Sequence, residues 1–567
     1  MAEGGKDQGE SRSPTARSRA ARHEPDEELT RQQAQEGATR QPAGEGRRQS
    51  PRTRVARTRP ERYLIAVAPP ADVRILASEF DQEPDTRLLK TIGTARAMNG
   101  PRAIVVETPG ARAAALASVG HLRVEPDERL DWASSVLPGA AGTQGLLGGA
   151  GGGPRAVAPV GDLHTVQVMV SNDAGRPVPD AEVWLTGPGG PATGYTGADG
   201  HAELTVPVET AVDPDAMWVR PARGCWPALV NRPEIEPGQS VTAVCERIVT
   251  TFPDFPERAL QSWGARSMGF GMLPPTHRGN GVKLALIGSG VAAGHPDLSG
   301  RVSGGLDVIT QTQKGWQEDP IGTGTHLAVL LAGRDDGTGV VGLAPEAELH
   351  VCRTAPGGHC SDLVEALDYC IAKDVDIALI TVSMRYPTAM LAEKVAQARA
   401  HGVACIAAAG DGAGPIGYPA ALPGVLAVGA VGMAGTFPLD SGLAVRMAGP
   451  SGVSGFFAPA FASQGPGIDC CGPGVAIVSG LPPTSYGPLD GTAVAAAHVA
   501  GAAALVLAHH PGMRTPSGVK SDAARVGRLF SILLASCRPL PGVSPAIAGA
   551  GLPDVAAAMG IAGWAWP

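Results

Sequence analysis

The sequence predicts an α/β fold for its C-terminal half: a parallel β-sheet with helices on both faces, preceded by a small α+β domain and a β-sandwich. From about residue 280, short and nearly continuous apolar runs recur, as expected of strands buried on both faces. They are VKLALIG, LHVCRT, VDIALITVS, GVACIAAAG and GVLAVGAV. The segments SDLVEALDYCIAK and LAEKVAQARAHG between them have helical periodicity. In such sheets, functional sites form at the carboxyl ends of the strands.

Three regions of different composition precede that sheet. Residues 1–61 are polar, aperiodic and rich in Arg, Gln, Glu and Pro, which predicts a disordered tail. Residues 62–130 hold two strand–helix–strand passages, typical of a ferredoxin-like α+β domain, although TRLLKTIG has helical or mixed periodicity. Residues 131–162 are rich in Gly, Ala and Pro, which predicts a flexible linker.

The region 163–250 alternates apolar and polar residues with period two. The alternation breaks at two expected turns, 173–175 and 198–200. This strand–turn–strand pattern predicts a β-sandwich. The opening and the TGADG turn resemble those of transthyretin-like and carboxypeptidase-regulatory-like modules, which implies an accessory role.

Length and composition limit the class of protein. At 567 residues the chain is too long for one core, and it predicts about three or four domains. The formal net charge of −8 gives no indication of nucleic acid or a membrane surface as the partner. The arginines between Arg47 and Arg62 are better explained by a solvated tail than by a nucleic-acid patch. We expect no apolar run to approach the roughly 18–20 residues of a membrane span.

Cysteine usage and the N-terminal residues favour a cytoplasmic protein. The nine cysteines are scattered, odd in number and without a CxxC pair. Cys225 and Cys245 lie in one β-rich region, so a disulfide between them stays open as an alternative to two thiols. The adjacent Cys470 and Cys471 are interpreted as core or turn residues. Residues 1–28 are charged and lack an apolar stretch, which is not typical of a secretory signal.

Four segments within the last region, 251–567, resemble the conserved blocks of the subtilases, the subtilisin-like serine peptidases. They are GNGVKLALIGSGVAAGHPDLSGRV; GTGTHLAVLLAG with GVVGLAPEAELHVCR; GVACIAAAGDGAG with YPAALPGVLAVGAV; and DGTAVAAAHVAGAAALVLAHHP. Their order and spacing agree with the family. The resemblance implies a subtilisin-like sheet, and it implies that the domain at 62–130 is similar to an inhibitor-type propeptide.

The same resemblance identifies where catalytic groups are missing. Serine peptidases need a nucleophile, a histidine base and an aspartate that orients the histidine. The family's Asp position is Gly288, its first His of the H-G-T-H quartet is Thr323, and its Ser is Ala493. The Asn that donates to the oxyanion is Asp411, and a carboxylate there is expected to repel that charge.

The substrate-edge strand also departs from the family's S-L-G-G. It is Ser383, Met384, Arg385 and Tyr386 in this chain. Two glycines that let a peptide backbone approach are replaced by large side chains, which are expected to narrow or fill the peptide groove.

Relocated chemistry is the alternative to lost chemistry. Ser289, Thr492, His295 and His498 lie near the degenerate positions, but equivalents of all four exist beside an intact triad, so packing and helix starts explain them better. The surviving His326 corresponds to a structural histidine of the family. No HExxH pattern or phosphate loop is found in the required context, so we expect neither a metal nor another cofactor.

The leading hypothesis is therefore a pseudoprotease that binds or scaffolds a peptide or protein partner. The first alternative is an active serine endopeptidase with unconventional catalytic residues. The second is a recognition module in which the sandwich at 163–250 or the Arg-rich tail binds a partner. Because self-cleavage requires a catalytic centre, the leading hypothesis also predicts that the domain at 62–130 stays attached and that the strand after it plugs the groove.

Overall fold

A computed structural model describes residues 60–67, 73–80, 83, 85–92, 102–132, 162–236, 238–438, 441–443, 452, 454–513 and 522–561. The chain divides into two units, Met1–Ala56 and Arg57–Pro567, and the described residues all belong to the second. Residues 1–59 of the predicted tail and most of the predicted linker lie outside the described residues, whereas Glu61, the last residue of the predicted tail, already begins a strand. The domain boundaries at 61, 130, 162 and 250 stay predictions.

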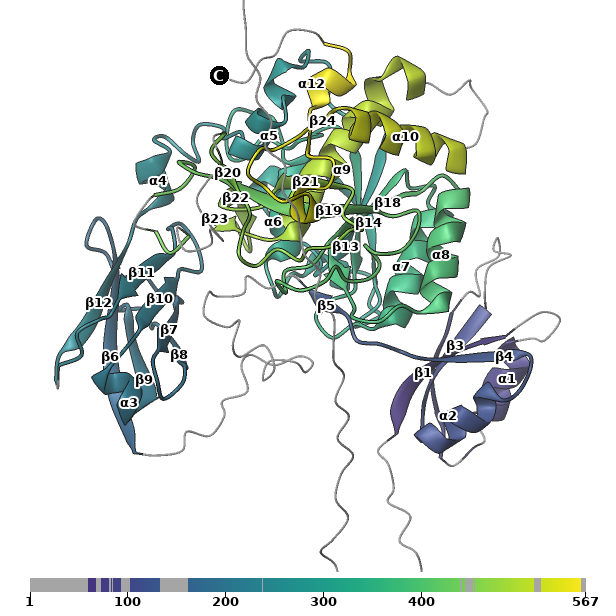
Figure 1. Cartoon of the computed structure of the whole chain (residues 1–567), viewed down its shortest axis with the longest axis horizontal. Helices are drawn as coiled ribbons and strands as arrows, with labels where there is room; N and C mark the ends of the chain where they lie inside the picture. Colours follow the sequence, from purple (N-terminus) through teal and green to yellow (C-terminus); the bar gives the residue numbers. More distant parts are fainter. Residues whose placement is uncertain are drawn as a thin grey trace, which may run out of the picture. The chain divides into compact units, whose positions relative to one another are not determined.

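The first described region forms a ferredoxin-like α+β sandwich (Figure 1). Its elements are β1 (Glu61–Val67), α1 (Val73–Phe80), β2 (Arg87–Ile92), β3 (Arg102–Thr108), α2 (Gly110–Ala117) and β4 (Leu122–Pro126). The sheet has the order β2-β3-β1-β4, and its pairs are antiparallel. The TRLLKTIG segment, whose periodicity was ambiguous, forms β2, because pairing with β3 fixes it as a strand.

The second described region is a two-sheet β-sandwich. Its elements are β6 (Leu163–Asn172), β7 (Glu182–Thr186), β8 (Ala192–Tyr195), β9 (His201–Pro207), α3 (Val208–Val212), β10 (Ala216–Arg220), β11 (Ala228–Asn231) and β12 (Ser240–Cys245). The sheets have the orders β11-β10-β7-β8 and β12-β6-β9. Both expected turns are present, with Gly175 and Gly200 at positive φ. Cys225 and Cys245 are buried free thiols, and burial raises the pKa of Cys245 to about 12.

The third region is built on an eight-stranded, mostly parallel sheet with the order β14-β15-β13-β16-β18-β19-β20, and β21 pairs with β19. The strands are β13 (Lys283–Gly288), β14 (Val302–Asp307), β15 (Glu348–Arg353), β16 (Ile377–Ile380), β18 (Ala404–Ala408), β19 (Leu426–Met433), β20 (Phe456–Phe457) and β21 (Cys470–Pro473). Only β19–β20 is antiparallel. The five apolar runs therefore form buried strands as predicted.

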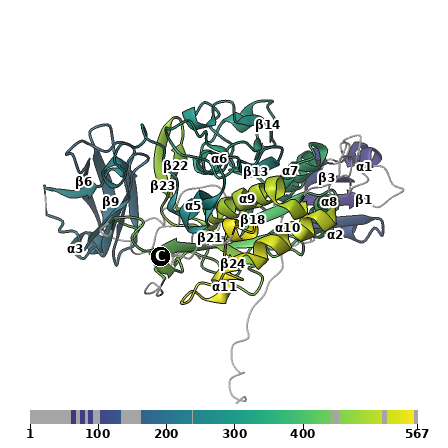
Figure 2. The ribbon, with the colours of Figure 1, turned by 90° about the horizontal axis from the view of Figure 1, so that it is seen from above.

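Helices cover both faces of this sheet, as Figures 1 and 2 show. They are α6 (Thr323–Ala332), α7 (Cys360–Ala372), α8 (Ala389–Ala400), α9 (Thr492–His509) and α10 (Ala523–Ala535). Side chains of β13 alternate between two cores: Leu284 and Leu286 pack with α6 and α9, whereas Ala285 and Ile287 pack with α7 and α8. This alternation is the physical reason that the strand is apolar throughout.

Shorter elements complete the chain. They are β5 (Asp131–Trp132), α4 (Ile248–Thr251), α5 (Trp263–Ser267), β17 (Val382–Ser383), β22 (Ile477–Leu481), β23 (Ser485–Leu489), β24 (Cys537–Arg538), α11 (Pro545–Ala548), β25 (Leu552–Pro553) and α12 (Val555–Ala558). Single 3-10 turns lie at Phe270–Met272, Pro296–Leu298, Gly315–Gln317 and Pro511–Met513.

The expectation about apolar runs is wrong for α9. Among the described residues, this 18-residue helix is long and apolar enough to cross a membrane by length and composition. Its apolar window is 89% buried inside the protein, so its composition is explained by its place in the main core.

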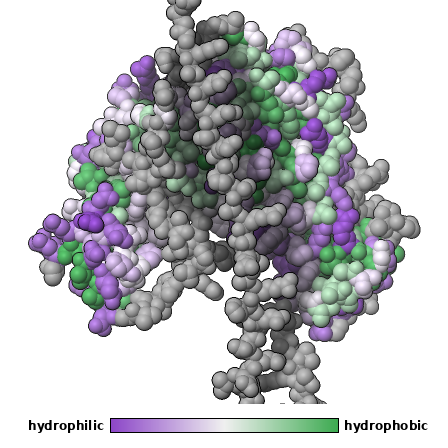
Figure 3. All heavy atoms as spheres, in the orientation of Figure 1, coloured by the Kyte–Doolittle hydropathy of each residue, from purple (hydrophilic) through white to green (hydrophobic). Residues whose placement is uncertain are grey.

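On the face drawn in Figure 3, hydrophilic and hydrophobic residues of the described surface are interspersed.

Candidate functional site

The three degenerate catalytic positions lie at the start or end of three core elements. Gly288 is the last residue of β13, Thr323 is the first residue of α6, and Ala493 is the second residue of α9. Strand ends and helix starts of this kind are the usual location of sites in open α/β sheets. The sequence blocks therefore lie where the family comparison places them.

Hydrogen bonds connect these elements in pairs. The Gly324 N–H donates to Ser289 Oγ at 2.9 Å, which joins the start of α6 to the end of β13. The Thr492 N–H donates to Asp411 Oδ1 at 2.7 Å, which joins the start of α9 to the segment after β18. In addition, α6 and α9 pack against each other.

None of the three residues carries the chemistry of peptide hydrolysis. Gly288 has no side chain, and the Ala493 methyl group is buried at 1% exposure. A threonine hydroxyl at position 323 is not basic enough to accept a proton near neutral pH. The site therefore has no nucleophile, no base and no orienting acid at the expected places.

The space beside Gly288 is taken by Thr381. A Cβ added at Gly288 would lie 2.5 Å from Thr381 Oγ1, which itself donates to the Ile287 carbonyl at 2.8 Å. Real Cβ atoms do not approach another heavy atom that closely, so the neighbour would have to move. A side chain at position 288 therefore requires the Thr381 hydroxyl to shift.

This contact gives a prediction for Gly288→Ala. We expect the free energy of unfolding to fall by about 1–3 kcal/mol, the typical effect of overpacking a well-packed core. The double variant Gly288→Ala/Thr381→Ala should recover most of that loss, because the obstructing hydroxyl is removed. Urea unfolding of the four members of this cycle measures the coupling. If the changes in the free energy of unfolding of the two single variants simply add in the double variant, Thr381 does not restrict the side chain at position 288.

Asp411 is held against the N-terminus of α9. Its Oδ1 accepts both the Thr492 N–H at 2.7 Å and the Thr492 hydroxyl at 2.8 Å. The N-cap residue, Gly491, has φ 145 and provides no side-chain cap, so the carboxylate satisfies a helix N–H from outside the helix. A negative charge is also favourable at this end of a helix. Asp411 thus stabilises the helix start.

We therefore expect Asp411→Ala to lower the free energy of unfolding by about 1 kcal/mol, as the loss of a helix cap does. Asp411→Asn keeps an oxygen that can accept the Thr492 N–H, and it should lose less. Thermal unfolding of both variants checks this. If Asp411→Asn and Asp411→Ala destabilise the protein equally, the negative charge of Asp411, and not its hydrogen-bond acceptor, stabilises the start of α9.

Ser289, the residue after Gly288, is buried and engaged in hydrogen bonds. Its hydroxyl donates to Asp319 Oδ1 at 2.8 Å, and the side chain is buried. The same carboxylate accepts the Gly322 N–H at 2.8 Å, and its Oδ2 accepts the N–H and the hydroxyl of Thr325 at 2.7 and 2.6 Å. Asp319 thus organises the loop before α6 and holds the Ser289 hydroxyl in place.

The neighbouring histidines are packing residues. His295, His326 and His498 are fully buried. His326 Nε2 bonds the Ile477 carbonyl at 2.8 Å, and His295 Nε2 bonds the Ser485 carbonyl at 3.0 Å. His498 contacts Ser262 Oγ at 3.2 Å, but that hydroxyl caps α5 by accepting the Ala265 N–H. Burial lowers the pKa of His326 and of His498 to about 4.

The edge of the groove is occupied by a strand of the chain itself. VDIALITVS divides into β16 in the main sheet and β17, which pairs antiparallel with β5, so that Val382 faces Trp132 and Ser383 faces Asp131. The predicted linker thus begins with a strand. Arg385 and Tyr386 are exposed, Tyr386 at 57%, and the expectation that they narrow or fill the groove stays a prediction. Met384 is buried and its backbone pairs with Tyr418.

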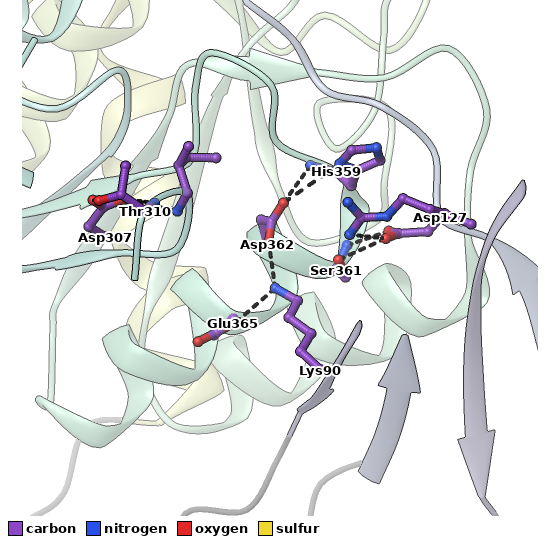
Figure 4. Close-up of polar contacts among 10 residues, drawn as sticks. Lys90, Asp127, Asp307, Thr310, His359, Ser361, Asp362 and Glu365 are labelled. Atoms are coloured by element: carbon purple, nitrogen blue, oxygen red, sulfur yellow. Dashed lines mark hydrogen bonds and ion pairs between the residues drawn. The ribbon is translucent and has the colours of Figure 1, made fainter. Parts of the chain in front are cut away.

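Buried carboxylates fix the α+β domain to the main domain (Figure 4). Asp127, whose side chain is 0% exposed, pairs with Arg62 at 3.0 Å. It accepts the N–H and the hydroxyl of Ser361, in the first turn of α7, at 2.8 and 2.9 Å. The helix N-terminus favours this negative charge.

Two further contacts extend this interface. Glu125 accepts the N–H groups of Ala389 and Met390 at 3.1 and 3.2 Å, at the start of α8. Lys90 forms ion pairs with Asp362 and Glu365 of α7, and its distance to Glu365 is 2.9 Å (Figure 4). Apolar residues of β1, β2 and β3 belong to the same buried cluster as those of α7 and α8. The α+β domain therefore shares a core with the main domain.

The sequence reasoning missed these docking residues. Asp127 and Glu125 lie in the segment HLRVEPDERL, whose sequence predicts a strand and gives no partner for either carboxylate. In the structure Glu125 belongs to β4, and Asp127 directly follows it. Both carboxylates contact helix starts that are far away in the sequence. Asp127 and Ser361 are 234 residues apart, and Glu125 and Ala389 are 264 residues apart. Local pattern alone does not give such partners.

Comparison with known proteins agrees with this geometry. The model of the Subtilase family matches residues 279–521. Subtilisin E of Bacillus subtilis (strain 168) is 34% identical over 267 residues, which are 45% of this chain and 63% of that protein. Subtilisin of Bacillus pumilus is 34% identical over 267 residues, 88% of its length. Alkaline protease of Shouchella clausii is 30% identical over 312 residues, 53% of this chain and 73% of that protein.

The doubly covered sheet and the four blocks at its strand ends define an α/β protein of the serine-peptidase type. The chain belongs to the subtilase family. It spans 63% of the length of Subtilisin E.

Proposed function

We propose that this chain is a pseudoprotease, a subtilase that binds or scaffolds a protein or peptide partner and does not hydrolyse peptides. The observation that carries the proposal is the joint replacement of acid, base, nucleophile and oxyanion donor by Gly288, Thr323, Ala493 and Asp411. One replacement would leave residual catalysis, because the oxyanion hole and substrate binding still act. The fourth replacement removes the oxyanion donor as well.

The surroundings of the site support this proposal. Thr381 takes the space next to Gly288, and Asp411 is engaged by Thr492, so two of the four positions are adapted to their new residues. Ser289 is engaged with Asp319. These contacts favour a site that has been repacked over one that awaits a missing group.

The groove gives the proposal its mode of binding. Asp131 and Trp132 occupy the strand position beside β17, and the domain before them shares a core with α7 and α8. We propose that this domain stays covalently attached and that partners bind the assembled scaffold or displace β5. We further propose a cytoplasmic location, in view of the scattered free cysteines. In view of the net charge of −8, we propose neither nucleic acid nor a membrane as the partner.

The alternative is an active serine endopeptidase with unconventional residues. Family membership favours it, since the related proteins are named subtilisins and alkaline proteases. The buried and engaged state of Ser289 and His498 weighs against it.

Peptidase assays test the proposal directly. The full chain is expected to cleave casein or a fluorogenic peptide at least about 10⁶-fold more slowly than Subtilisin E, because losing the serine or the histidine alone has an effect of that size. Its mass should be that of the intact chain. Cleavage that a serine-directed phosphonate blocks, or self-trimming between residues 131 and 160, would contradict the proposal and favour the alternative.

A further inference from the structure

A cavity of about 650 Å³ lies where the β-sandwich joins the main domain. Its walls come from the connection after β12, from α5 and from the segment after β19; Figure 1 shows α4 of that connection between the sandwich and the main domain. The lining residues are Glu246, Thr251, Phe252, Trp263, Arg266, Met433, Gly435, Thr436, Phe437 and Pro438. None of them belongs to the degenerate triad or to the groove.

The aromatic side chains that line this cavity pack against further aromatic rings outside the lining. Phe252 packs against Trp226 with ring centroids 6.3 Å apart, Trp263 against Phe456 at 6.4 Å, and Phe437 against Phe457 at 6.4 Å. The Trp263 indole also donates to the Val475 carbonyl at 3.0 Å. Rings fixed in this way form a preformed apolar surface, and Met433 adds an adaptable thioether to it.

Two opposite charges line the same cavity. Glu246 Oε1 accepts the Thr251 hydroxyl at 2.8 Å, and that hydroxyl accepts the Trp226 indole N–H at 2.8 Å, so the carboxylate is oriented by a hydrogen-bonded chain. Arg266 donates to the Gln261 carbonyl at 3.0 Å. Within the part of the chain that the structure describes, neither Glu246 nor Arg266 forms an ion pair.

We propose that this cavity binds a small zwitterion with an apolar body, either a short apolar peptide or a free apolar amino acid. The ammonium group would pair with Glu246, the carboxylate with Arg266, and the apolar side chains would pack on Phe252, Phe437 and Met433. The volume lies within the roughly 300–1,000 Å³ of small-ligand sites, which prefer domain junctions. It is large enough for more than one residue, which favours a di- or tripeptide. The inference is independent of the proposed pseudoprotease function.

Calorimetric titration of the full chain with the dipeptide Phe-Leu tests this site. We expect binding, and a loss of affinity of about tenfold or more in Glu246→Gln and in Arg266→Gln, because each removes one charge-assisted contact. Glutamine at 246 can still accept the Thr251 hydroxyl, so the fold should be kept. Arg258→Gln is the matched control, since Arg258 is exposed and outside the lining; it should bind as the native chain does.

Blocked and single-residue ligands sharpen the test. N-acetyl-Phe-Leu-amide lacks both charges and should bind at least about tenfold more weakly than Phe-Leu. Free phenylalanine binding as tightly as Phe-Leu would support the site and assign it to amino acids. No binding of Phe-Leu or phenylalanine, equal binding of the blocked peptide, or unchanged affinity in both charge variants would overturn the proposal. Thermal unfolding of each variant verifies that a loss of binding is not a loss of fold.

Discussion

Replacing Asp127 by alanine is expected to detach the α+β domain from the helices that it covers. The carboxylate is fully buried and is shared by Arg62 and the first turn of α7. Removing one partner of a buried ion pair leaves the other charge uncompensated, with a typical loss of about 3–5 kcal/mol. The Arg62 pair lies within the α+β domain, whereas the bonds to Ser361 cross to the main domain, so part of the loss should fall on docking. Asp127→Asn, which keeps the acceptor, should lose less.

Hydrogen exchange measured by mass spectrometry provides the readout. In Asp127→Ala, amides of the first turns of α7 and α8 should exchange faster than in the native chain, since both helix starts are covered by the docked domain. Arg123→Ala is the matched control, because Arg123 and Glu393 form an exposed pair across the same interface, each about 44% exposed. A pair of that kind contributes about 0–1 kcal/mol. Unchanged exchange in Asp127→Ala would show that apolar contacts alone hold the domain.

Acidification is expected to destabilise the protein strongly between pH 6.5 and 4. Burial lowers the pKa of His326 and His498 to about 4 in the folded chain, whereas a histidine in the unfolded chain titrates near 6.5. Between these two pH values the unfolded chain binds more protons than the folded chain. The contribution of the two neutral histidines to the free energy of unfolding is therefore fully present above pH 6.5 and is lost as the pH decreases towards 4. Each histidine accounts for about 2 kcal/mol at pH 5 and about 3 kcal/mol below pH 4.

Urea unfolding at pH 7 and pH 5 measures this effect, and nuclear magnetic resonance of the histidine ring protons assigns it. The rings of His326 and His498 should stay neutral at pH 5. His401 is exposed and outside the core, so His401→Gln should leave the pH dependence of stability unchanged. Titration of His326 and His498 near pH 6.5 in the folded chain would contradict the prediction.

Much of the fold follows from local pattern. VKLALIG and GVLAVGAV are apolar at successive positions because their side chains enter cores on both faces of the sheet, and the structure places Ala285 and Leu286 on opposite sides. Period-two alternation and the turns at Gly175 and Gly200 predict the sandwich, because only one face of each of its strands enters the core. The 3.6-residue periodicity likewise predicts α7 and α8.

Part of the candidate site also follows from pattern. Gly288, Thr323 and Ala493 are identified because their blocks keep the family's order, and such blocks lie at strand ends and helix starts. Their chemistry is then a property of residue type alone. Local pattern says less about the groove. The expected narrowing by Arg385 and Tyr386 stays a prediction, and the structure adds that both side chains are exposed and that the two-residue strand β5 pairs with β17.

The sequence by itself therefore determines the sheet, the helices and which residues stand at the family's catalytic positions, since each depends on residue type and on spacing within a few turns or strands. The tertiary structure alone decides that Thr381 fills the space at Gly288, that Asp411 holds the start of α9, and that Asp127 joins two domains. These contacts join residues that are 81 or more positions apart, as for Asp411 and Thr492. Nothing in a local pattern specifies such partners, because packing chooses them only once the chain has folded.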